Sequence, residues 1–179
     1  VSVAEDEFFK KGYYYPQDEA SALSAYVLSP VAGDKVIDMC AAPGGKTTYL
    51  AQLMGNCGEI IAFDLYEHKI ELINNNCKRL GIKNVQAKAW DATVLMDDFV
   101  DKADKVLADV PCSGIGIIRK KPDIKWNKET RDFDAIISIQ KGILENAQKY
   151  LKKGGTLVYS TCTLNKNENE NVVKEFAEK

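Results

Sequence analysis

Two of the five cysteines lie in short polar motifs whose residue types could do chemistry. Cys112 comes just after the apolar, β-branched run Asp104–Val110, and Cys162 ends the similar run Gly155–Cys162. A thiolate is the nucleophilic form of cysteine, and nearby positive charge or a hydrogen-bond donor stabilises it. Both thiols are therefore candidate nucleophiles, and their positions alone do not choose between them.

The other three cysteines carry weaker signals. Free cysteines are usually small buried hydrophobic residues, and we expect Cys57 and Cys77 to be of this kind. Cys40 is expected to pack behind a loop, with its backbone near a ligand. The sequence contains no CxxC pair, and the odd number and wide spacing of the cysteines predict reduced thiols rather than disulfides or a metal site.

A loop of small residues follows the first predicted strand. It consists of Cys40, Ala41, Ala42, Pro43, Gly44, Gly45 and Lys46. Small side chains let the backbone approach a ligand just before a helix N-terminus. The letters GKT at its end are the tail of a P-loop, but the first glycine of that motif would fall at position 40, which is Cys. The dinucleotide motif GxGxxG does not occur here either, so we expect a nucleoside ligand without a pyrophosphate.

Acidic residues follow the next predicted strands. Asp64 ends the second strand about 20 residues after the loop, where an acid can hydrogen-bond ribose hydroxyls. Asp91 follows the third strand and could accept a hydrogen bond from an adenine amino group, with Trp90 packed on the ring. The structural alternatives are that Asp64 caps a helix and that Asp91 is a turn residue. Combined with the loop, the acids favour S-adenosylmethionine over NAD or ATP.

The elements that position these residues alternate between strand and helix patterns. Predicted strands are Lys35–Cys40, Glu59–Asp64, Asn84–Ala89, Asp104–Val110 and Gly155–Cys162. Predicted helices are Asp18–Leu28, Gly45–Met54, Glu67–Leu80, Phe133–Leu151 and Glu168–Lys179, with Gly81 and Gly154 closing the third and fourth. This order predicts an α/β fold with a mostly parallel, doubly wound sheet, which is a Rossmann-like architecture. Ligands of such sheets bind at the carboxyl ends of the strands, where both thiol motifs lie.

One methyl-transfer reaction needs a thiol at such a site. Carbon 5 of cytosine is a poor nucleophile until a thiolate adds to carbon 6 and turns the ring into an enamine-like species. An acid near ring nitrogen 3 stabilises this adduct, and Asp109, on the strand that leads to Cys112, is placed for that role if its carboxyl is protonated or shares a proton with the base. The thiol must afterwards be expelled, and a second thiol could assist that step.

Bulk properties are those of one ordinary globular domain. The 179 residues are 45% hydrophobic and 28% charged, and the apolar runs are far shorter than the roughly 18 residues of a membrane span. The N-terminal residues do not resemble a signal peptide, so we expect a cytoplasmic protein. The net charge of −2 is a weak signal for nucleic-acid binding. Positive charge concentrates in one segment, Arg119–Lys128, which also contains Trp126.

Several motifs together resemble the Nop/Sun (Fmu-like) family of RNA 5-methylcytosine methyltransferases. The resemblance covers Gly12 to about Val173. The segments that carry it are Gln17–Ser21, Asp38–Thr47, Asp109–Gly114, Arg119 with Pro122–Trp126, Ser160–Thr163 and Glu168–Glu170.

The resemblance implies a fold, a cofactor and residue roles. It implies a class I S-adenosylmethionine-dependent methyltransferase acting on rRNA or tRNA, with Cys40–Lys46, Asp64, Asp91 and Asp109 at the cofactor. Cys162 would be the nucleophile, and Cys112 would help to release the product. Arg119, Lys121, Lys125 and Trp126 would meet RNA.

Two further expectations concern extent and alternatives. Residues 1–179 are expected to form a single catalytic domain without the N-terminal RNA-binding domain and the final antiparallel strands of many relatives. One alternative is a module that binds S-adenosylmethionine or RNA without turnover. A P-loop-like nucleotide hydrolase is the other, and Cys40 in place of the first motif glycine disfavours it.

Overall fold

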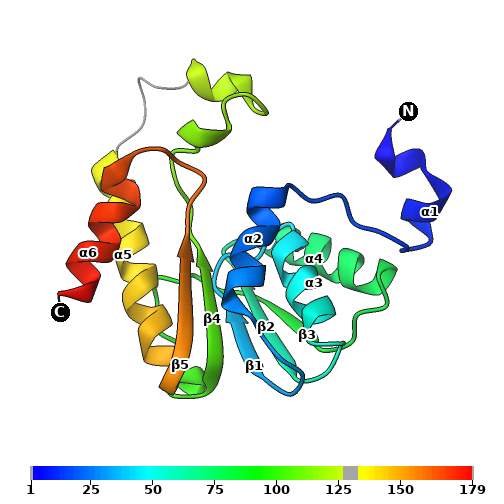
Figure 1. Ribbon diagram of the computed structural model, residues 1–179, viewed down its shortest axis with the longest axis horizontal. Helices are drawn as coiled ribbons and strands as arrows, with labels where there is room; N and C mark the ends of the chain where they lie inside the picture. The colour runs from blue at the N-terminus through cyan, green and yellow to red at the C-terminus, as the bar shows by residue number, and fades with distance from the viewer. Residues whose placement is uncertain (1, 127–132, 179) are drawn as a thin grey trace.

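The computed structural model describes residues 2–126 and 133–178, which form one five-stranded parallel sheet flanked by helices (Figure 1). The strands are β1 (Lys35–Asp38), β2 (Glu59–Asp64), β3 (Val85–Ala89), β4 (Ala103–Asp109) and β5 (Leu151–Ser160). The helices are α1 (Glu7–Lys10), α2 (Glu19–Leu28), α3 (Gly45–Leu53), α4 (Glu67–Arg79), α5 (Phe133–Tyr150) and α6 (Glu170–Ala177). Short 3-10 turns cover Val3–Glu5, Asp97–Phe99, Ile115–Ile117, Pro122–Lys125 and Lys166–Glu168.

The strand order is β3-β2-β1-β4-β5, and every pairing is parallel. The chain first winds from β1 outward to β3 and then returns to β4 on the other side of β1. The order therefore reverses between β1 and β4, and this is the position at which doubly wound sheets bind ligands. The predicted fold class is confirmed.

Both faces of the sheet are covered, so alternate residues of each strand enter different cores. Ile37 of β1 packs with residues of α5, including Ile143 and Ala147, whereas its neighbour Val36 packs with residues of α2 and α3. Figure 1 shows α5 and α6 on one side of the sheet and α2, α3 and α4 on the other. The middle residues of the central strands are consequently apolar, as in Val36–Ile37 of β1, Ile60–Phe63 of β2 and Val106–Ala108 of β4.

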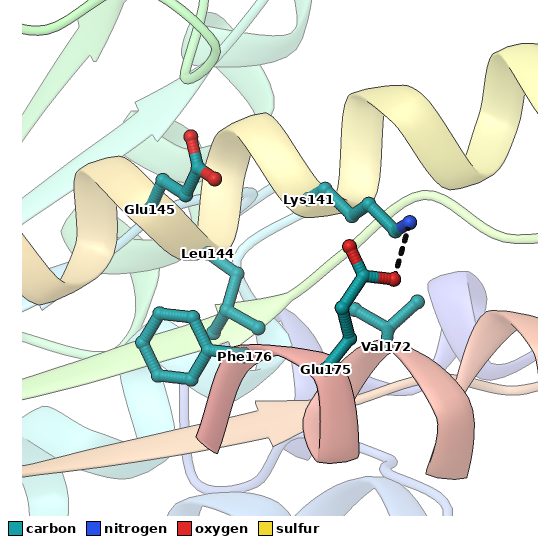
Figure 2. Close-up of a pocket in the computed structure, with 6 residues that line it drawn as sticks. All are labelled: Lys141, Leu144, Glu145, Val172, Glu175 and Phe176. Carbon is teal, nitrogen blue, oxygen red and sulfur yellow. Dashed lines mark hydrogen bonds and ion pairs between the residues drawn. The ribbon is translucent and has the colours of Figure 1, made fainter. Parts of the chain in front are cut away.

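Helix α6 lies against α5, and Figure 2 shows the contact. Lys141 of α5 forms an ion pair with Glu175 of α6 at 2.7 Å, beside the apolar side chains of Leu144, Val172 and Phe176. The pocket between them has a volume of about 10 Å³, which is room for about one water molecule. This pocket is too small to hold a nucleoside.

The last strand differs most from the prediction. Helix α5 ends at Tyr150 and β5 begins at Leu151, whereas we expected Gly154 to separate helix from strand. Leu151 already pairs with Ala103, and the register then shifts, so Gly154, at φ +83°, lies in an irregularity of β5 rather than at a helix cap. The strand also ends at Ser160, which leaves Cys162 in the loop after it.

The other predicted elements are present with small changes at their ends. Strand β2 has the predicted bounds, and Gly81 follows α4 at φ +68°, as a C-terminal cap requires. Helix α6 begins at Glu170 rather than Glu168, because Lys166–Glu168 forms a 3-10 turn. None of the described helices is long and apolar enough to cross a membrane.

Candidate functional site

The two thiol motifs meet at the carboxyl end of the sheet. The Sγ atoms of Cys112, after β4, and Cys162, after β5, lie 3.2 Å apart. The backbone N–H of Cys162 also points at Cys112 Sγ, at 3.3 Å. Gly116 fixes the second loop, since its N–H donates to the Cys162 carbonyl at 3.0 Å and any side chain there would collide with that oxygen. The nucleophile candidates thus form one pair.

The contact makes the two thiols unequal. The hydrogen bond from Cys112 lowers the pKa of Cys162 to about 7, although burial and the nearby Asp109 carboxylate oppose the shift. The same hydrogen bond raises the pKa of Cys112. The first proton therefore leaves the pair easily and the second with difficulty. Cys162 is also exposed while Cys112 is half-buried, so the more acidic sulfur is the accessible one.

An ion pair lies beside the thiols. Lys46, in the first turn of α3, contacts the Oδ2 atom of Asp109 at 2.8 Å, and the Ser160 hydroxyl donates to Oδ1 of the same carboxylate. Asp109 ends β4 and Ser160 ends β5. The Asp109 carboxylate therefore connects α3, β4 and β5 near the position where the strand order reverses. Lys46 also contributes to lowering the pKa of Cys162, but less than Cys112 does.

The loop of small residues borders a cavity of about 190 Å³. Its lining residues are Tyr15, Pro16, Gln17, Asp18, Ser21, Cys40, Ala41, Ala42, Pro43, Gly45, Lys46 and Asp109. The Nε2 atom of Gln17 is buried and has no hydrogen-bond partner among the residues that the structure describes. An orphaned donor of this kind requires an acceptor, which a bound polar ligand can supply.

The glycines of the loop are needed for packing inside the protein as well as for the shape of the cavity. Gly44 adopts φ +103°, and a side chain there would press on Ile73 of α4 at 3.2 Å. A side chain at Gly45 would meet the ring of Tyr15 at 3.0 Å. We expected small residues only for close approach of a ligand, and the structure adds internal packing as a second reason.

The two acids after β2 and β3 lie outside the residues that line the cavity. Asp64 is buried and accepts a hydrogen bond from the Ala42 N–H at 3.1 Å. This hydrogen bond stabilises the conformation of the loop of small residues. Asp91 is exposed and accepts from the N–H and the hydroxyl of Thr93, at 2.9 and 2.7 Å. This is the turn geometry that we considered as the structural alternative for Asp91. Trp90 donates to the Val94 carbonyl at 2.7 Å.

The sequence profile of the 16S rRNA methyltransferase RsmB/F family matches residues 25–179. The chain belongs to this family. It is 43% identical over 98% of its length to a probable ribosomal RNA small subunit methyltransferase B of Bacillus subtilis. It is 45% identical over 97% of its length to a tRNA (cytosine(72)-C(5))-methyltransferase of Pyrococcus horikoshii. The family expected from the motifs is confirmed.

A solved structure supports the same relationship. The crystal structure of NSun6 from Pyrococcus horikoshii with SFG matches 99% of this chain and 45% of its own, with a TM-score of 0.90 and 45% identity. The chain spans about two fifths of the length of the curated relatives it matches, 39% and 43%. These proteins are similar to the chain over its whole length, and they extend beyond it.

Two buried acids of this RsmB/F family member had no role in our sequence prediction. Glu168 is fully buried beneath both thiol loops, and Asp38 is fully buried at the end of β1. Burial raises the pKa of Asp38 to about 7, and the hydrogen bond from the Thr47 hydroxyl at 2.7 Å opposes that rise. Within the described part of the chain, its Oδ1 atom has no hydrogen-bond partner. The sequence around these acids did not indicate that they are buried. Both lie in motifs of the family to which our sequence analysis gave no chemical role.

The basic segment is only partly described. Positions 127 and 128 of Arg119–Lys128 lie outside the described residues. Arg119, Lys121 and Trp126 are exposed, and Lys125 ends the 3-10 turn. Lys120 forms an ion pair with Asp18, the residue that caps α2 beside the cavity.

Of the remaining cysteines, Cys57 differs from our expectation in its exposure to solvent. Cys77 is buried among apolar residues, as predicted, and Cys40 packs against the core on the α5 side of the sheet. Cys57 is exposed, so its prediction was wrong. It lies in the turn between α3 and β2, where Gly58 must approach the backbone of Gly33 and Asp34 and leaves the neighbouring side chain outside the core.

Proposed function

We propose that this chain is the catalytic domain of an S-adenosylmethionine-dependent RNA (cytosine-5) methyltransferase. The observation that carries the proposal is the contact between Cys112 and Cys162 beside the Lys46–Asp109 ion pair. Addition of a thiolate to a base needs one acidic thiol, and its expulsion gains from a second group near the sulfur. Membership of the RsmB/F family and the cytosine methyltransferase among its relatives support the same reaction.

The cavity at the glycine loop suits the methyl donor. It combines small apolar residues with the unpartnered Gln17 donor, the Lys46 ammonium and the Asp109 carboxylate, which match a zwitterionic nucleoside. The backbone of Cys40–Gly45 would hold this ligand, and the hydrogen bond from the Ala42 N–H to Asp64 would keep the loop in place. When bound, S-adenosylmethionine supplies an electrophilic methyl group.

Cys162 starts the reaction on the base. Its thiolate, available near neutral pH, forms a bond to carbon 6 of cytosine, and the electrons of the ring double bond shift toward carbon 5 and nitrogen 3. Lys46 and Asp109 lie next to the thiol pair, where the Lys46 ammonium and a proton shared between Asp109 and ring nitrogen 3 would stabilise the negative charge that develops on the base. Carbon 5 thereby becomes nucleophilic.

Cys112 acts when the product leaves. After carbon 5 has bonded to the methyl group, a base takes its proton, the electrons of the broken C–H bond re-form the ring double bond, and the bond between carbon 6 and Cys162 Sγ breaks, which releases the sulfur as a thiolate. The thiol of Cys112, 3.2 Å away, can hydrogen-bond that departing thiolate. The interaction that lowers the pKa of Cys162 before attack thus also stabilises it as a leaving group.

The substrate class follows from the relatives and the basic segment. We propose a cytosine in rRNA or tRNA, since the relatives are named for both. Arg119, Lys121 and Lys125 would meet phosphates, and the exposed Trp126 would stack on a base or pack beside one.

Product analysis tests the proposal. The chain is incubated with S-adenosylmethionine carrying a labelled methyl group and with transcripts of small-subunit rRNA or tRNA, and the RNA is digested to nucleosides. The expected product is 5-methylcytidine. A different methylated nucleoside would overturn the proposal, and donor binding without any product would favour the binding-module alternative.

A further inference from the structure

Glu168 is a buried carboxylate that lies beneath the two thiol loops. Its Oε2 atom accepts a hydrogen bond from the Ser113 N–H at 2.7 Å, and Oε1 accepts from Asn165 Nδ2 at 3.0 Å. Longer contacts come from the Thr163 hydroxyl and from Gln140 Nε2, both at 3.4 Å. The carboxylate is thus surrounded by donors from the loop after β4, the loop after β5 and helix α5.

The donors are direct neighbours of the reacting thiols. Ser113 follows Cys112 in the chain, and Thr163 follows Cys162. Their two hydroxyls contact each other at 2.7 Å, and Gln140 also donates to the Pro111 carbonyl at 3.0 Å. A movement of Glu168 would therefore move both residues that flank the sulfur atoms.

Several acceptor sites at one point explain why an acid occupies this position. An ionised carboxylate has about four lone-pair sites and no donor, so it can satisfy donors from several segments at once. Burial opposes ionisation of Glu168, but the hydrogen bonds from Ser113, Asn165 and Gln140 outweigh burial and lower its pKa. A buried charge without such partners would be strongly unfavourable.

We infer that Glu168 is a positioning residue that holds the loops after β4 and β5 so that Cys112 stays within hydrogen-bonding distance of Cys162. It does not touch the sulfur atoms and acts through Ser113 and Thr163. The inference deepens the proposed function and rests on it only for its catalytic consequence. The arrangement of the two thiols can be measured without RNA or methyl donor.

The direction in which the acidity of Cys162 changes on replacement of Glu168 distinguishes a positioning role from a direct effect of its charge. The groups that face the Cys162 thiol are Cys112, Asp109 and Lys46. Removal of the negative charge of Glu168 would by itself make a nearby thiol more acidic. Loss of the Cys112 hydrogen bond would instead make Cys162 less acidic. Positioning and charge therefore predict opposite shifts in one experiment.

The test compares Glu168→Gln with Glu170→Gln in the 179-residue chain. Glu170 is an exposed acid two residues further on, so its variant loses the same charge and only a long, exposed contact to Lys166 at 3.8 Å. The rate of Cys162 alkylation by iodoacetamide is followed against pH by peptide mass spectrometry, with the exposed Cys57 as internal reference. Circular dichroism and thermal unfolding show that each variant is folded.

We expect Glu168→Gln to raise the pH midpoint of Cys162 alkylation by about one unit, which slows the reaction near pH 7 about five-fold. Glu170→Gln and the rate at Cys57 should stay unchanged. An unchanged or lowered midpoint in folded Glu168→Gln overturns the inference.

A second variant covers the case in which Glu168→Gln does not fold. Thr163→Val keeps the side-chain shape but removes the hydroxyl that contacts Ser113, so it should raise the midpoint in the same direction. No shift in this variant would overturn the inference. Failure of the proposed function is read separately, as absence of 5-methylcytidine from the unsubstituted chain.

Discussion

Cys112 and Cys162, which are 50 positions apart in the chain, bring their sulfur atoms to 3.2 Å from each other at the end of the sheet. One of these thiols becomes more acidic because the other remains protonated. The acidity of each thiol therefore depends on the other. Replacing one cysteine at a time is needed to assign a separate role to each.

Replacing Cys162 removes the proposed nucleophile. Cys162→Ala should reduce methyl transfer by about a thousand-fold or more, because carbon 5 is not activated without thiolate addition. Affinity for S-adenosylmethionine, measured by calorimetry, should stay within about two-fold, since Cys162 does not line the cavity. Undiminished methyl transfer would show that another residue attacks the base.

Replacing Cys112 should leave attack possible and hinder release. Cys112→Ala removes the hydrogen bond to the departing sulfur, so we expect a covalent protein–RNA adduct through Cys162 to accumulate. The adduct is seen as a band of low mobility on a denaturing gel that nuclease treatment collapses. Cys57→Ala, at the other exposed cysteine, is the control. Adducts formed by Cys162→Ala instead would mean that the two roles are exchanged.

Asp38 makes stability depend on pH. Its folded-state pKa is raised to about 7 from 3.8, chiefly by burial, so the folded chain holds a proton in this range that the unfolded chain has lost. The free energy of unfolding should therefore fall by a few kcal/mol as the pH rises through this window and level off above it.

Asparagine at this position tests that dependence. Asp38→Asn cannot ionise, so its advantage over the unsubstituted chain in urea unfolding should grow between about pH 4 and about pH 7 and then stay constant. Asp98→Asn, at an exposed acid, should change nothing. Parallel pH profiles for the unsubstituted chain and Asp38→Asn would contradict the prediction.

Arg79 holds the N-terminal segment against the cavity. Its guanidinium lies 3.8 Å from the centre of the Phe9 ring and donates to the carbonyls of Phe9 and Tyr14, at 2.7 and 3.0 Å. Arg79→Ala should release Tyr15 from the cavity wall and weaken binding of S-adenosylmethionine roughly ten-fold, or about 1.4 kcal/mol. Calorimetry measures the loss. Lys78→Ala, at the exposed neighbouring cation, should bind normally, and equal affinity in both variants would refute the anchor.

The sequence predicted the parts of the site that depend on local pattern. Small residues before a helix identified the loop at Cys40–Lys46, and polar residues after apolar runs placed Cys112, Cys162 and Asp109 at one edge. Parallel strands align their carboxyl ends, so strand order was not needed for that inference.

Contacts between distant segments could not be predicted in the same way. Nothing in the residues around Glu168 indicates that Ser113 would lie beside it, because that contact depends on the pairing of β4 with β5. Asp91 is not among the residues that line the cavity, and Thr93 supplies two donors to its carboxylate within the turn. A side chain that can be satisfied nearby need not reach a ligand.

The spacing of the two sulfur atoms also limits how a nucleobase can enter. Stacked rings are about 3.4 Å apart, so a planar ring with a sulfur atom on each face would need roughly 7 Å between the two sulfurs, and it cannot lie between sulfurs separated by 3.2 Å. The ring must approach the exposed side of Cys162, with the half-buried Cys112 behind the attacking atom. Both thiols would therefore lie on the same face of the pyrimidine. The opposite face would stay open to the incoming methyl group.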